Sequence, residues 1–348
     1  MPITVIVGGQ YGSEGKGKVA YCLAKEKSAT IAIRVGGSNS GHTVLDSNGE
    51  RYVFRHLPTP VLLPGTICIL PAGSYLDLNV LFKEIQQIGL SPQRLLIDPN
   101  AVIITKHDSN EETTGNLRES IGSTLSGTGS AVVKRILRNK DCLLAKDEPL
   151  LKEYIQPVVP FMRRKIEQGE RIILEGTQGF GLSVLHASTY PYVTSRDTTA
   201  AAFVSEAGLS PLDVDEVILT LRTFPIRVGG NSGPLSNEIT WEIISKNSGS
   251  KENIQEYTSV TNRLRRVAAF DAEIVNQAIM VNKPTDIVLN HLDYVDHECR
   301  NIDAPTDIAR RFISDIEAKI GLSIKYYGFG PSSLTSKTGL RQWAMNIK

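Results

Sequence analysis

Residues 3–24 join a short apolar run, a glycine-rich turn and the start of a helix, and this arrangement restricts the fold more than any other feature. Residues 3–7 are uniformly apolar and mostly β-branched, as expected of a strand covered on both faces. The turn at residues 8–18 has the sequence GGQYGSEGKGK, and residues 19–24 begin a helix. Free backbone N–H groups and the helix dipole attract anions at such a point. The turn therefore predicts a phosphate site, and a nucleotide is the expected ligand.

This phosphate turn departs from two common nucleotide-binding patterns. The usual P-loop has Gly, four residues and then Gly-Lys-Ser/Thr. Here Gln10 replaces the first glycine, and Gly17 replaces the Ser/Thr that would bind magnesium. The Gly-x-Gly-x-x-Gly spacing of dinucleotide-binding turns does not fit either. A tight turn with surface lysines is the alternative, but so many glycines at a helix start are costly without a ligand.

Short apolar runs alternate with amphipathic stretches along the rest of the chain. This alternation predicts an α/β fold with a central, mostly parallel β-sheet. Strands are expected at residues 31–35, 67–70, 95–97, 172–174, 217–221 and 287–289, and helices at 78–88, 151–166 and 308–320. Residues 245–258 are polar and predict a mobile surface loop. Because there is neither a repeat nor a low-complexity linker, we expect a single domain over residues 1–348.

The composition argues against several classes of protein. The 38 Lys and Arg balance 37 Asp and Glu, so the charge gives no reason to expect nucleic acid or a membrane as a partner. The four cysteines are scattered without a CxxC pair, which argues against disulfides or zinc. No apolar run approaches the roughly 20 residues of a membrane span. A strand begins almost at the N-terminus, so no signal peptide is expected and the predicted location is cytoplasmic.

A second glycine-rich turn, at residues 36–43, follows the strand expected at 31–35 and carries His42. A single histidine is more often structural than catalytic. The flanking glycines beside an expected phosphate site favour a functional role here. In a nucleotide site, an imidazolium would stabilise charge on a transferring phosphoryl group.

Three further polar segments follow along the chain. Residues 175–181 and 189–199 carry Gln and Thr side chains that suit a base edge or a phosphate, although ordinary turn chemistry explains them equally well. Residues 263–266 include three arginines, whose guanidinium groups suit carboxylates and phosphates, although a charge run is usually a solvated face. Asn290 and Asp293 form an Asn-x-x-Asp element after an expected strand, similar to the purine-reading element of GTP-binding proteins.

Taken in this order, the motifs resemble the adenylosuccinate synthetase family over residues 3–331, and the short archaeal-type members most of all. The resemblance implies a two-step ligase. A nucleoside triphosphate phosphorylates the 6-oxo group of a purine nucleotide, and the amine of L-aspartate then displaces phosphate. The first step is needed because an amide-like oxygen leaves badly and a phosphate leaves well. The resemblance also implies Mg²⁺ and a homodimer.

The resemblance further implies the residues of the site. The donor nucleotide would be bound by Gly12, Ser13, Glu14, Gly15, Lys16, Gly17, Gly41, His42, Thr43, Asn290, Asp293, Gly330 and Pro331. The acceptor nucleotide would be bound by Ser13, Asn39, Ser123, Thr124, Gln178, Thr194, Arg263 and, from the second subunit, Arg138. L-aspartate would be bound by Thr261, Arg263 and Arg265, and magnesium by Ser13 and Gly41. The catalytic residues would be Ser13, Lys16, His42 as the acid, and Gln178.

The chain departs from the family pattern at Ser13, where the family has an Asp that takes the proton from purine N1 and binds magnesium. A serine hydroxyl is too weakly basic for that task. Water held by Ser13, the carboxylate of Glu14 or the substrate aspartate are candidate replacements. The chain is then an inactive homologue, an ordinary synthetase with a surrogate base, or an enzyme with a changed acceptor.

The changed acceptor is the interpretation we favour. Guanine carries a 2-amino group beside N1, and the short Ser13 side chain leaves room for it while its hydroxyl can accept an N–H. This departure resembles the phage branch of the family, 2-aminodeoxyadenylosuccinate synthetase. That branch condenses dGMP with L-aspartate on the way to 2-aminoadenine for viral DNA, with ATP or dATP as donor.

The identity of the donor base is less constrained. Asp293 suits guanine, but the changed neighbours His291 and Phe329 weaken this preference, so ATP or dATP is expected. Two alternatives stay open. One is the ordinary reaction of IMP, L-aspartate and GTP. The other is a purine sensor without turnover, against which His42 and the arginines argue.

Overall fold

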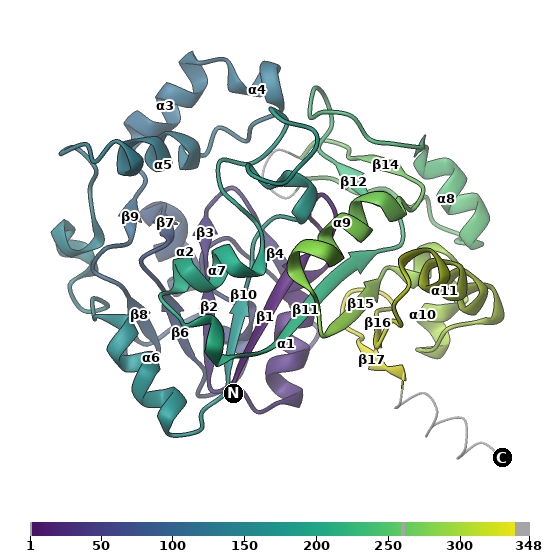
Figure 1. The fold of residues 1–348 in the computed structure, drawn as a ribbon, viewed down its shortest axis with the longest axis horizontal. Coiled ribbons are helices and arrows are strands. Elements are labelled where there is room, and N and C mark those ends of the chain that lie inside the picture. Colours follow the sequence, from purple (N-terminus) through teal and green to yellow (C-terminus); the bar gives the residue numbers. More distant parts are fainter. Residues whose placement is uncertain (1, 259–261, 338–348) are drawn as a thin grey trace.

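The computed structural model describes residues 2–258 and 262–337 and confirms the expected α/β fold (Figure 1). Within these residues, a nine-stranded sheet forms the centre. Its neighbouring strands pair in parallel, except for the antiparallel pair at the β17 edge. In spatial order the strands are β17 (Thr335–Ser336), β16 (Tyr326–Tyr327), β15 (Asp286–Asn290), β11 (Val214–Arg222), β1 (Ile3–Gly8), β10 (Ile172–Glu175), β2 (Ile31–Arg34), β6 (Ile67–Leu70) and β8 (Leu95–Ile97).

Three small sheets lie outside the central one. One is antiparallel, one is parallel and one is a two-stranded hairpin. They comprise β12 (Ile226–Arg227), β14 (Arg266–Ala268) and β13 (Glu238–Ile239); β3 (Gly36–Gly37), β7 (Ser74–Leu76) and β9 (Val102–Ile103); and β4 (His42–Leu45) with β5 (Arg51–Phe54).

Helices cover the sheets on both sides. In the described residues, no helix has the length and hydrophobicity needed to cross a bilayer. The α-helices are α1 (Lys16–Glu26), α2 (Leu78–Ile88), α3 (Lys106–Thr114), α4 (Leu117–Ile121), α5 (Thr128–Ile136), α6 (Val158–Glu167), α7 (Ala200–Ala207), α8 (Trp241–Ser248), α9 (Ala272–Asn282), α10 (Glu298–Ile302) and α11 (Asp307–Ile320).

Two sequence predictions are wrong at their boundaries. The helix expected at 151–166 begins only at Val158, because Pro157 lacks an N–H and disfavours a helical conformation in the residue before it. The surface loop expected at 245–258 is helical over its first four residues. There α8 continues into polar sequence because Trp241 and Ile244 pack in a small core with Ile226.

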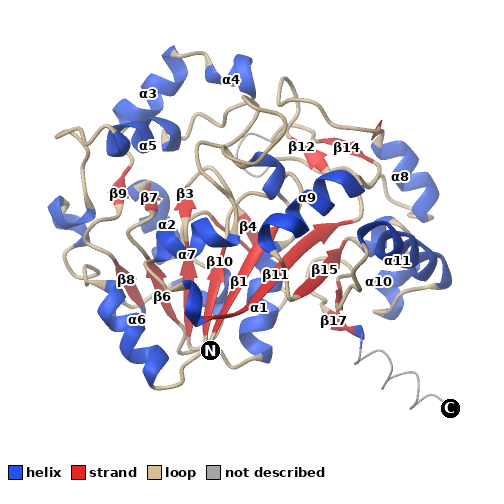
Figure 2. Ribbon diagram, in the orientation of Figure 1, coloured by secondary structure: helices blue, strands red, loops and turns tan. Residues whose placement is uncertain are grey.

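The central strands are apolar because both of their faces are buried. Along β1, Val5 and Val7 pack in the cluster that contains residues of α7, α9 and α11, whereas Ile6 packs against α1 on the other face. This alternation is the two-residue period of a strand. Figure 2 shows α7 and α9 crossing in front of the sheet.

The parallel strands bring polar residues to one edge of the sheet. Arg34, Glu175, Arg222 and Asn290 are the last residues of β2, β10, β11 and β15. In the strand register, Glu175 lies beside Arg34, and Arg222 lies beside Asn290. The phosphate turn leaves β1 at the same edge. Ligands bind at the carboxyl ends of the strands in open α/β sheets, so the fold places a site here.

Candidate active site

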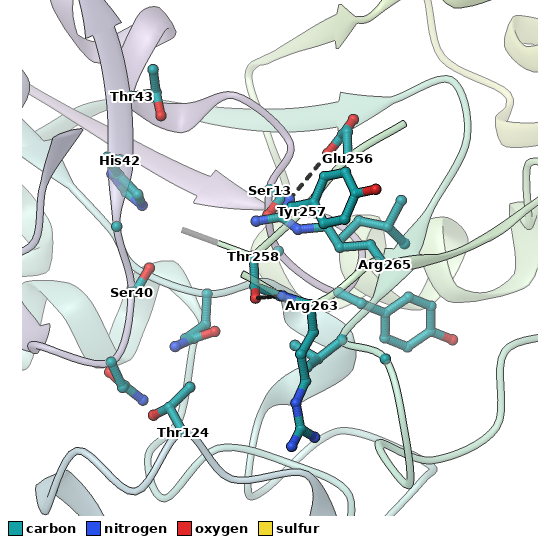
Figure 3. Close-up of a pocket in the computed structure, with 18 of the residues that line it drawn as sticks. Ser13, Ser40, His42, Thr43, Thr124, Glu256, Tyr257, Thr258, Arg263 and Arg265 are labelled. Atoms are coloured by element: carbon teal, nitrogen blue, oxygen red, sulfur yellow. Dashed lines mark hydrogen bonds and ion pairs between the residues drawn. The ribbon is translucent and has the colours of Figure 1, made fainter. Parts of the chain in front are cut away.

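A pocket of about 440 Å³ opens at this edge of the sheet and collects most of the predicted site residues (Figure 3). Its volume lies within the range of small-molecule sites. The predicted residues that line it are Gly12, Ser13, Gly15, Lys16, Gly17, Asn39, Gly41, His42, Thr43, Ser123, Thr124, Gln178, Arg263 and Arg265.

An adjoining pocket of about 370 Å³ extends the first toward α4. It shares Asn39, Ser123, Thr124 and Gln178 with the first pocket and adds Thr194. The structure therefore brings together the side chains that the resemblance assigns to the acceptor nucleotide, apart from Arg138.

The remaining predicted residues lie elsewhere. Thr261 falls outside the described residues. Arg138 lies just beyond α5 on the exposed surface, so its contribution from a second subunit stays a prediction. The residues that line neither pocket are Glu14, Arg138, Asn290, Asp293, Gly330 and Pro331.

Glu14 shapes the phosphate turn from the inside. Its fully buried carboxylate accepts hydrogen bonds from the N–H of Gln10 at 3.2 Å, from the N–H of Gly12 at 2.8 Å and from Lys16 Nζ at 2.6 Å. Ser13 has a left-handed φ of 57° and is exposed in the pocket. The carboxylate is thus occupied by the turn itself, which argues against Glu14 as the base that replaces the missing Asp.

Two glycines let this turn approach its neighbours. Gly15 has φ of 86°, and a Cβ there would lie 2.8 Å from Asn290 Nδ2. That amide donates a 2.7 Å hydrogen bond to the carbonyl of Glu14. A Cβ on Gly17 would lie 2.9 Å from the Cβ of His42. Any side chain at these positions would push the helix N-terminus away from the end of β15 or from His42.

His42 is held by a buried carboxylate. Its Nδ1 bonds Glu175, which also accepts from Arg34 Nη1 at 3.3 Å and from Thr59 N–H at 2.8 Å. Since a carboxylate only accepts, Nδ1 carries the proton and Nε2 has no partner among the described residues. Burial opposes ionisation of Glu175, but the hydrogen bond from His42 and the Arg34 cation hold its pKa below the usual range.

The charge of His42 in the ligand-free chain is set by its burial. Burial, reinforced by the Arg34 cation, lowers the pKa of His42 to about 4. The ring is therefore neutral at pH 7 in the ligand-free chain, whereas the predicted imidazolium concerns the nucleotide-bound site and stays a prediction. An anion in the pocket would favour the protonated ring, because an opposite charge nearby stabilises the charged form.

Sequence reasoning missed Arg222 and Glu256, which connect the arginine segment with the phosphate turn. Arg222 pairs with Glu256 and donates from Nη1 to the carbonyl of Ser13 at 3.1 Å. Glu256 also accepts from Arg265 Nη1 at 3.1 Å, as the dashed line in Figure 3 shows. The position of Arg222 at the end of a parallel strand is a sequence signal that could have indicated a site residue. Glu256 had none, because it lies in the polar segment predicted to be a surface loop.

Three arginines of the pocket have free guanidinium groups as far as the described residues go. The guanidinium groups of Arg263, Arg51 and Arg118 have no hydrogen bond or ion pair within these residues, and Arg263 is bonded to Thr258 only through its backbone N–H and carbonyl. In Figure 3 the Arg263 side chain extends away from Glu256 and Arg265. Sequence reasoning missed Arg51 and Arg118. Unpaired guanidinium groups in a polar pocket suit phosphates and carboxylates.

Asn290 and Asp293, which the resemblance assigns to the donor nucleotide, are buried, whereas Gly330 is half-buried and Pro331 is exposed. One oxygen each of Asp293 and Asn290 is buried without a partner in the described part of the chain. Lys18 Nζ donates to the carbonyl of Gly330 at 3.0 Å. Burial lowers the pKa of His291 to about 3, so this ring is neutral. Unpartnered buried oxygens can accept N–H groups of a base.

The protein oxygens available to magnesium are few. The hydroxyl of Ser13 and the carbonyl of Gly41 line the same pocket, and no cluster of three acidic, His or Cys side chains lies in the described residues. Magnesium usually keeps waters and binds substrate phosphates beside one or two protein oxygens. The residues present therefore fit an ion held mainly by the substrates.

Comparisons with known proteins agree with this geometry. The adenylosuccinate synthetase family model matches residues 5–142 and 143–307. The adenylosuccinate synthetase of Methanococcus aeolicus is 37% identical over 338 residues, covering 95% of this chain and 97% of the relative. That of Methanocaldococcus jannaschii is 39% identical over 335 residues, covering 94% of each chain.

Two solved structures share the fold. Cyanophage S-2L succinoaminodeoxyadenylate synthetase, bound to dGMP and to dATP as an energy donor, matches with a TM-score of 0.83 and 28% identity, covering 100% of this chain and 99% of that one. Fully ligated adenylosuccinate synthetase from Plasmodium falciparum also gives 0.83, at 22% identity, covering 97% of this chain and 100% of that one. The second likeness concerns the fold alone.

Proposed function

The chain belongs to the adenylosuccinate synthetase family, and we propose that it condenses dGMP with L-aspartate at the expense of ATP or dATP. The donor transfers its terminal phosphoryl group to O6 of guanine, and ADP or dADP leaves. The aspartate amine then attacks C6, the C6–O bond breaks and phosphate leaves. The product, 2-amino-2′-deoxy-N6-succinyladenylate, would serve synthesis of DNA that contains 2-aminoadenine, as in a bacteriophage-infected cytoplasm.

The observation that carries this proposal is Ser13. It lies in the pocket where the family has a carboxylate, and its hydroxyl makes no hydrogen bond within the described residues. The acidic side chains beside it, Glu14 and Glu256, are each engaged by cations. A neutral, short side chain leaves space for the guanine 2-amino group and can accept its N–H. A phage relative of this fold was solved with dGMP and dATP, which supports the same choice.

The other residues then take the following roles. Lys16 and the N–H groups at the start of α1 hold the donor phosphates, and His42 Nε2 meets the transferring phosphoryl group. Gln178 orients the acceptor base. Arg263 and Arg265 bind the carboxylates of L-aspartate.

Magnesium, held by Ser13, Gly41 and phosphate oxygens, would neutralise developing charge. Water on Ser13 or the substrate aspartate accepts the N1 proton, and Arg138 acts from the second subunit of a homodimer.

The ordinary reaction of IMP, L-aspartate and GTP is the second candidate. The identities of 37% and 39% with archaeal adenylosuccinate synthetases favour it. The unpartnered oxygen of Asp293 also favours it, because a carboxylate suits the N1–H and N2–H of a guanine donor.

Phosphate release by the purified protein tests the proposal. Reactions with L-aspartate and magnesium would compare dGMP with IMP, each with ATP, dATP and GTP as donor. We expect turnover with dGMP and an adenine donor. Ser13→Asp should move the preference toward IMP. Turnover of the unmodified protein with IMP alone would refute the proposed acceptor, and nucleotide binding without phosphate release would indicate a sensor.

A further inference from the structure

We propose that Arg222 and Glu256 form a positioning pair for the amine substrate, in which Glu256 holds the guanidinium of Arg265 ready for a carboxylate and Arg222 ties it to the backbone at Ser13. Neither residue belongs to the groups assigned to substrates above. The inference rests on the proposed ligase function, since it needs a carboxylate-bearing amine as substrate. It does not depend on whether the acceptor is dGMP or IMP.

The first argument is the continuity of the contacts. Arg222, which is fully buried, reaches two targets with one guanidinium group. Nη2 pairs with one oxygen of Glu256, and Nη1 donates to the Ser13 carbonyl at 3.1 Å. The other Glu256 oxygen accepts from Arg265 Nη1 at 3.1 Å. The hydroxyl of Tyr294 donates to Glu256 at 3.1 Å. Four side chains thus form one connected network from the phosphate turn to Arg265.

The second argument is that both ends of the network are fixed by the backbone. The side-chain amide of Gln10 accepts from the N–H of Arg222 at 2.9 Å and donates to its carbonyl at 3.1 Å. The indole N–H of Trp241 donates to the carbonyl of Arg265 at 2.7 Å. The N–H of Arg265 also donates to the carbonyl of Glu256 at 2.9 Å, so Arg265 is held at its backbone by two contacts and at its guanidinium by a third. A side chain held at both ends gives up little further freedom when it binds a ligand.

The third argument is the charge balance. Glu256 places one negative charge between two guanidinium groups, so the network keeps a net charge of +1. Burial works against ionisation of Glu256, but the Arg222 cation outweighs it and holds its pKa far below the usual range. Nε of Arg265 is buried without a partner in the described residues. The network thus keeps one positive charge that Glu256 does not compensate, beside the pocket that Arg265 lines, and this suits one incoming carboxylate.

The consequence is a mechanical link between the two half-reactions. The acceptor base is activated beside Ser13, and the amine must then approach C6 of that base. Because Arg222 bonds the Ser13 carbonyl directly, the position of the amine substrate and the position of the acceptor depend on the same side chain. Errors of about 1 Å in such alignment can cost about a hundredfold in rate.

The test replaces Glu256 and compares it with a matched neighbour. Glu256→Gln keeps the size of the side chain and removes the charge between the two arginines. The control is Glu238→Gln, which breaks the ion pair of the adjacent Arg266, at 2.7 Å, outside both pockets. Initial rates of phosphate release would give kcat and the KM of each substrate, with whichever of dGMP and IMP supports turnover.

We expect Glu256→Gln to raise the KM of L-aspartate by about tenfold or more, while the KM values of both nucleotides change by less than about twofold. Glu238→Gln should leave all three KM values unchanged. Arg222→Lys keeps the cation but cannot bridge Glu256 and Ser13 with a planar fork. It should raise the aspartate KM by about threefold and lower kcat, and it serves as the second variant if Glu256→Gln does not fold.

Each outcome has one meaning. Equal changes in all three KM values, or no change, would overturn the positioning pair, as would an aspartate effect of the same size in Glu238→Gln. Turnover with IMP but not dGMP would refute the proposed acceptor and leave this inference standing. No turnover of the unmodified protein with either acceptor would overturn both.

Discussion

The side of the pocket proposed to bind phosphate (the phosphate side) and the side proposed to bind the amine substrate (the amine side) are built differently. On the phosphate side, His42 and Lys16 are buried, and each is paired with a buried carboxylate. On the amine side, Arg263 extends from an irregular segment and its guanidinium has no partner in the described residues, while Arg265 is held by Glu256. The proposed chemical groups are thus preorganised by buried carboxylates at the start of α1 and of β4, whereas the proposed recognition of the amine is carried by an irregular segment.

The largest effect should come from the phosphate side. His42→Ala should lower kcat by about a thousandfold, within the range for loss of a general acid. The dissociation constant of the donor nucleotide, measured by titration calorimetry, should change little, because the phosphate turn is intact. An unchanged rate of phosphate release would show that His42 takes no part in the chemistry, and the proposed difference between the two sides would then be wrong.

Glu175 tests how strongly the phosphate side depends on its buried charge. Glu175→Gln removes the carboxylate that pairs with the buried Arg34 cation and leaves that cation with the weaker influence of Glu84. The free energy of unfolding should fall by about 3 kcal/mol, as when one partner of a buried ion pair is removed. Chemical denaturation would measure it. The exposed pair of Glu238 is the control, where Glu238→Gln should cost less than about 1 kcal/mol. Equal losses would contradict the argument.

Arg263 tests the amine side. Arg263→Met should lower kcat/KM for L-aspartate by about a hundredfold, because a charge-assisted bidentate contact is lost. Stability should be unchanged, since the guanidinium contacts no described partner. Steady-state kinetics would measure kcat/KM, and a thermal melt of the same preparation would measure stability. A destabilised variant would mean that Arg263 is a structural residue and that the two sides are more alike than described.

The last prediction concerns a buried histidine away from both pockets, and its effect is small over any single pH unit. Burial lowers the pKa of His56 to about 3 from an ordinary 6.5. Below about pH 6.5 the unfolded chain therefore binds a proton that the folded chain does not. The free energy of unfolding should fall as the pH falls toward 3, by up to about 1.4 kcal/mol per pH unit for this residue. His56→Gln should reduce the dependence of the free energy of unfolding on pH between pH 6 and 5. Urea unfolding at each pH would measure it, and an unchanged dependence would contradict this prediction.

The sequence predicted what depends on local pattern. The central strands were identifiable because strands buried on both faces are continuously apolar, and the phosphate turn because glycines and lysines at a helix start are typical of an anion site. The start of α6 differs from the prediction because Pro157 prevents the helix from extending toward residue 151, although the amphipathic period continues there.

The missed part of the site depends on partners far apart in the chain. Glu175 and His42 are 133 residues apart, and Arg222 and Glu256 are 34 apart. A single sequence carries no sign that such residues meet. Arg222 could have been suspected from its place at a strand end, but the polar sequence around Glu256 predicts only a solvated loop.

The separation of tasks between Ser13 and Glu14 has a consequence for how such an enzyme can change. Glu14 and the glycines hold the turn. The Ser13 side chain makes no hydrogen bond in the described residues, and only the backbone carbonyl of Ser13 is bonded to Arg222. The left-handed backbone at this position accepts Asp as readily as Ser. If residue 13 faces the acceptor as proposed, a lineage can exchange it without rebuilding its surroundings, and a change of substrate then costs little in folding.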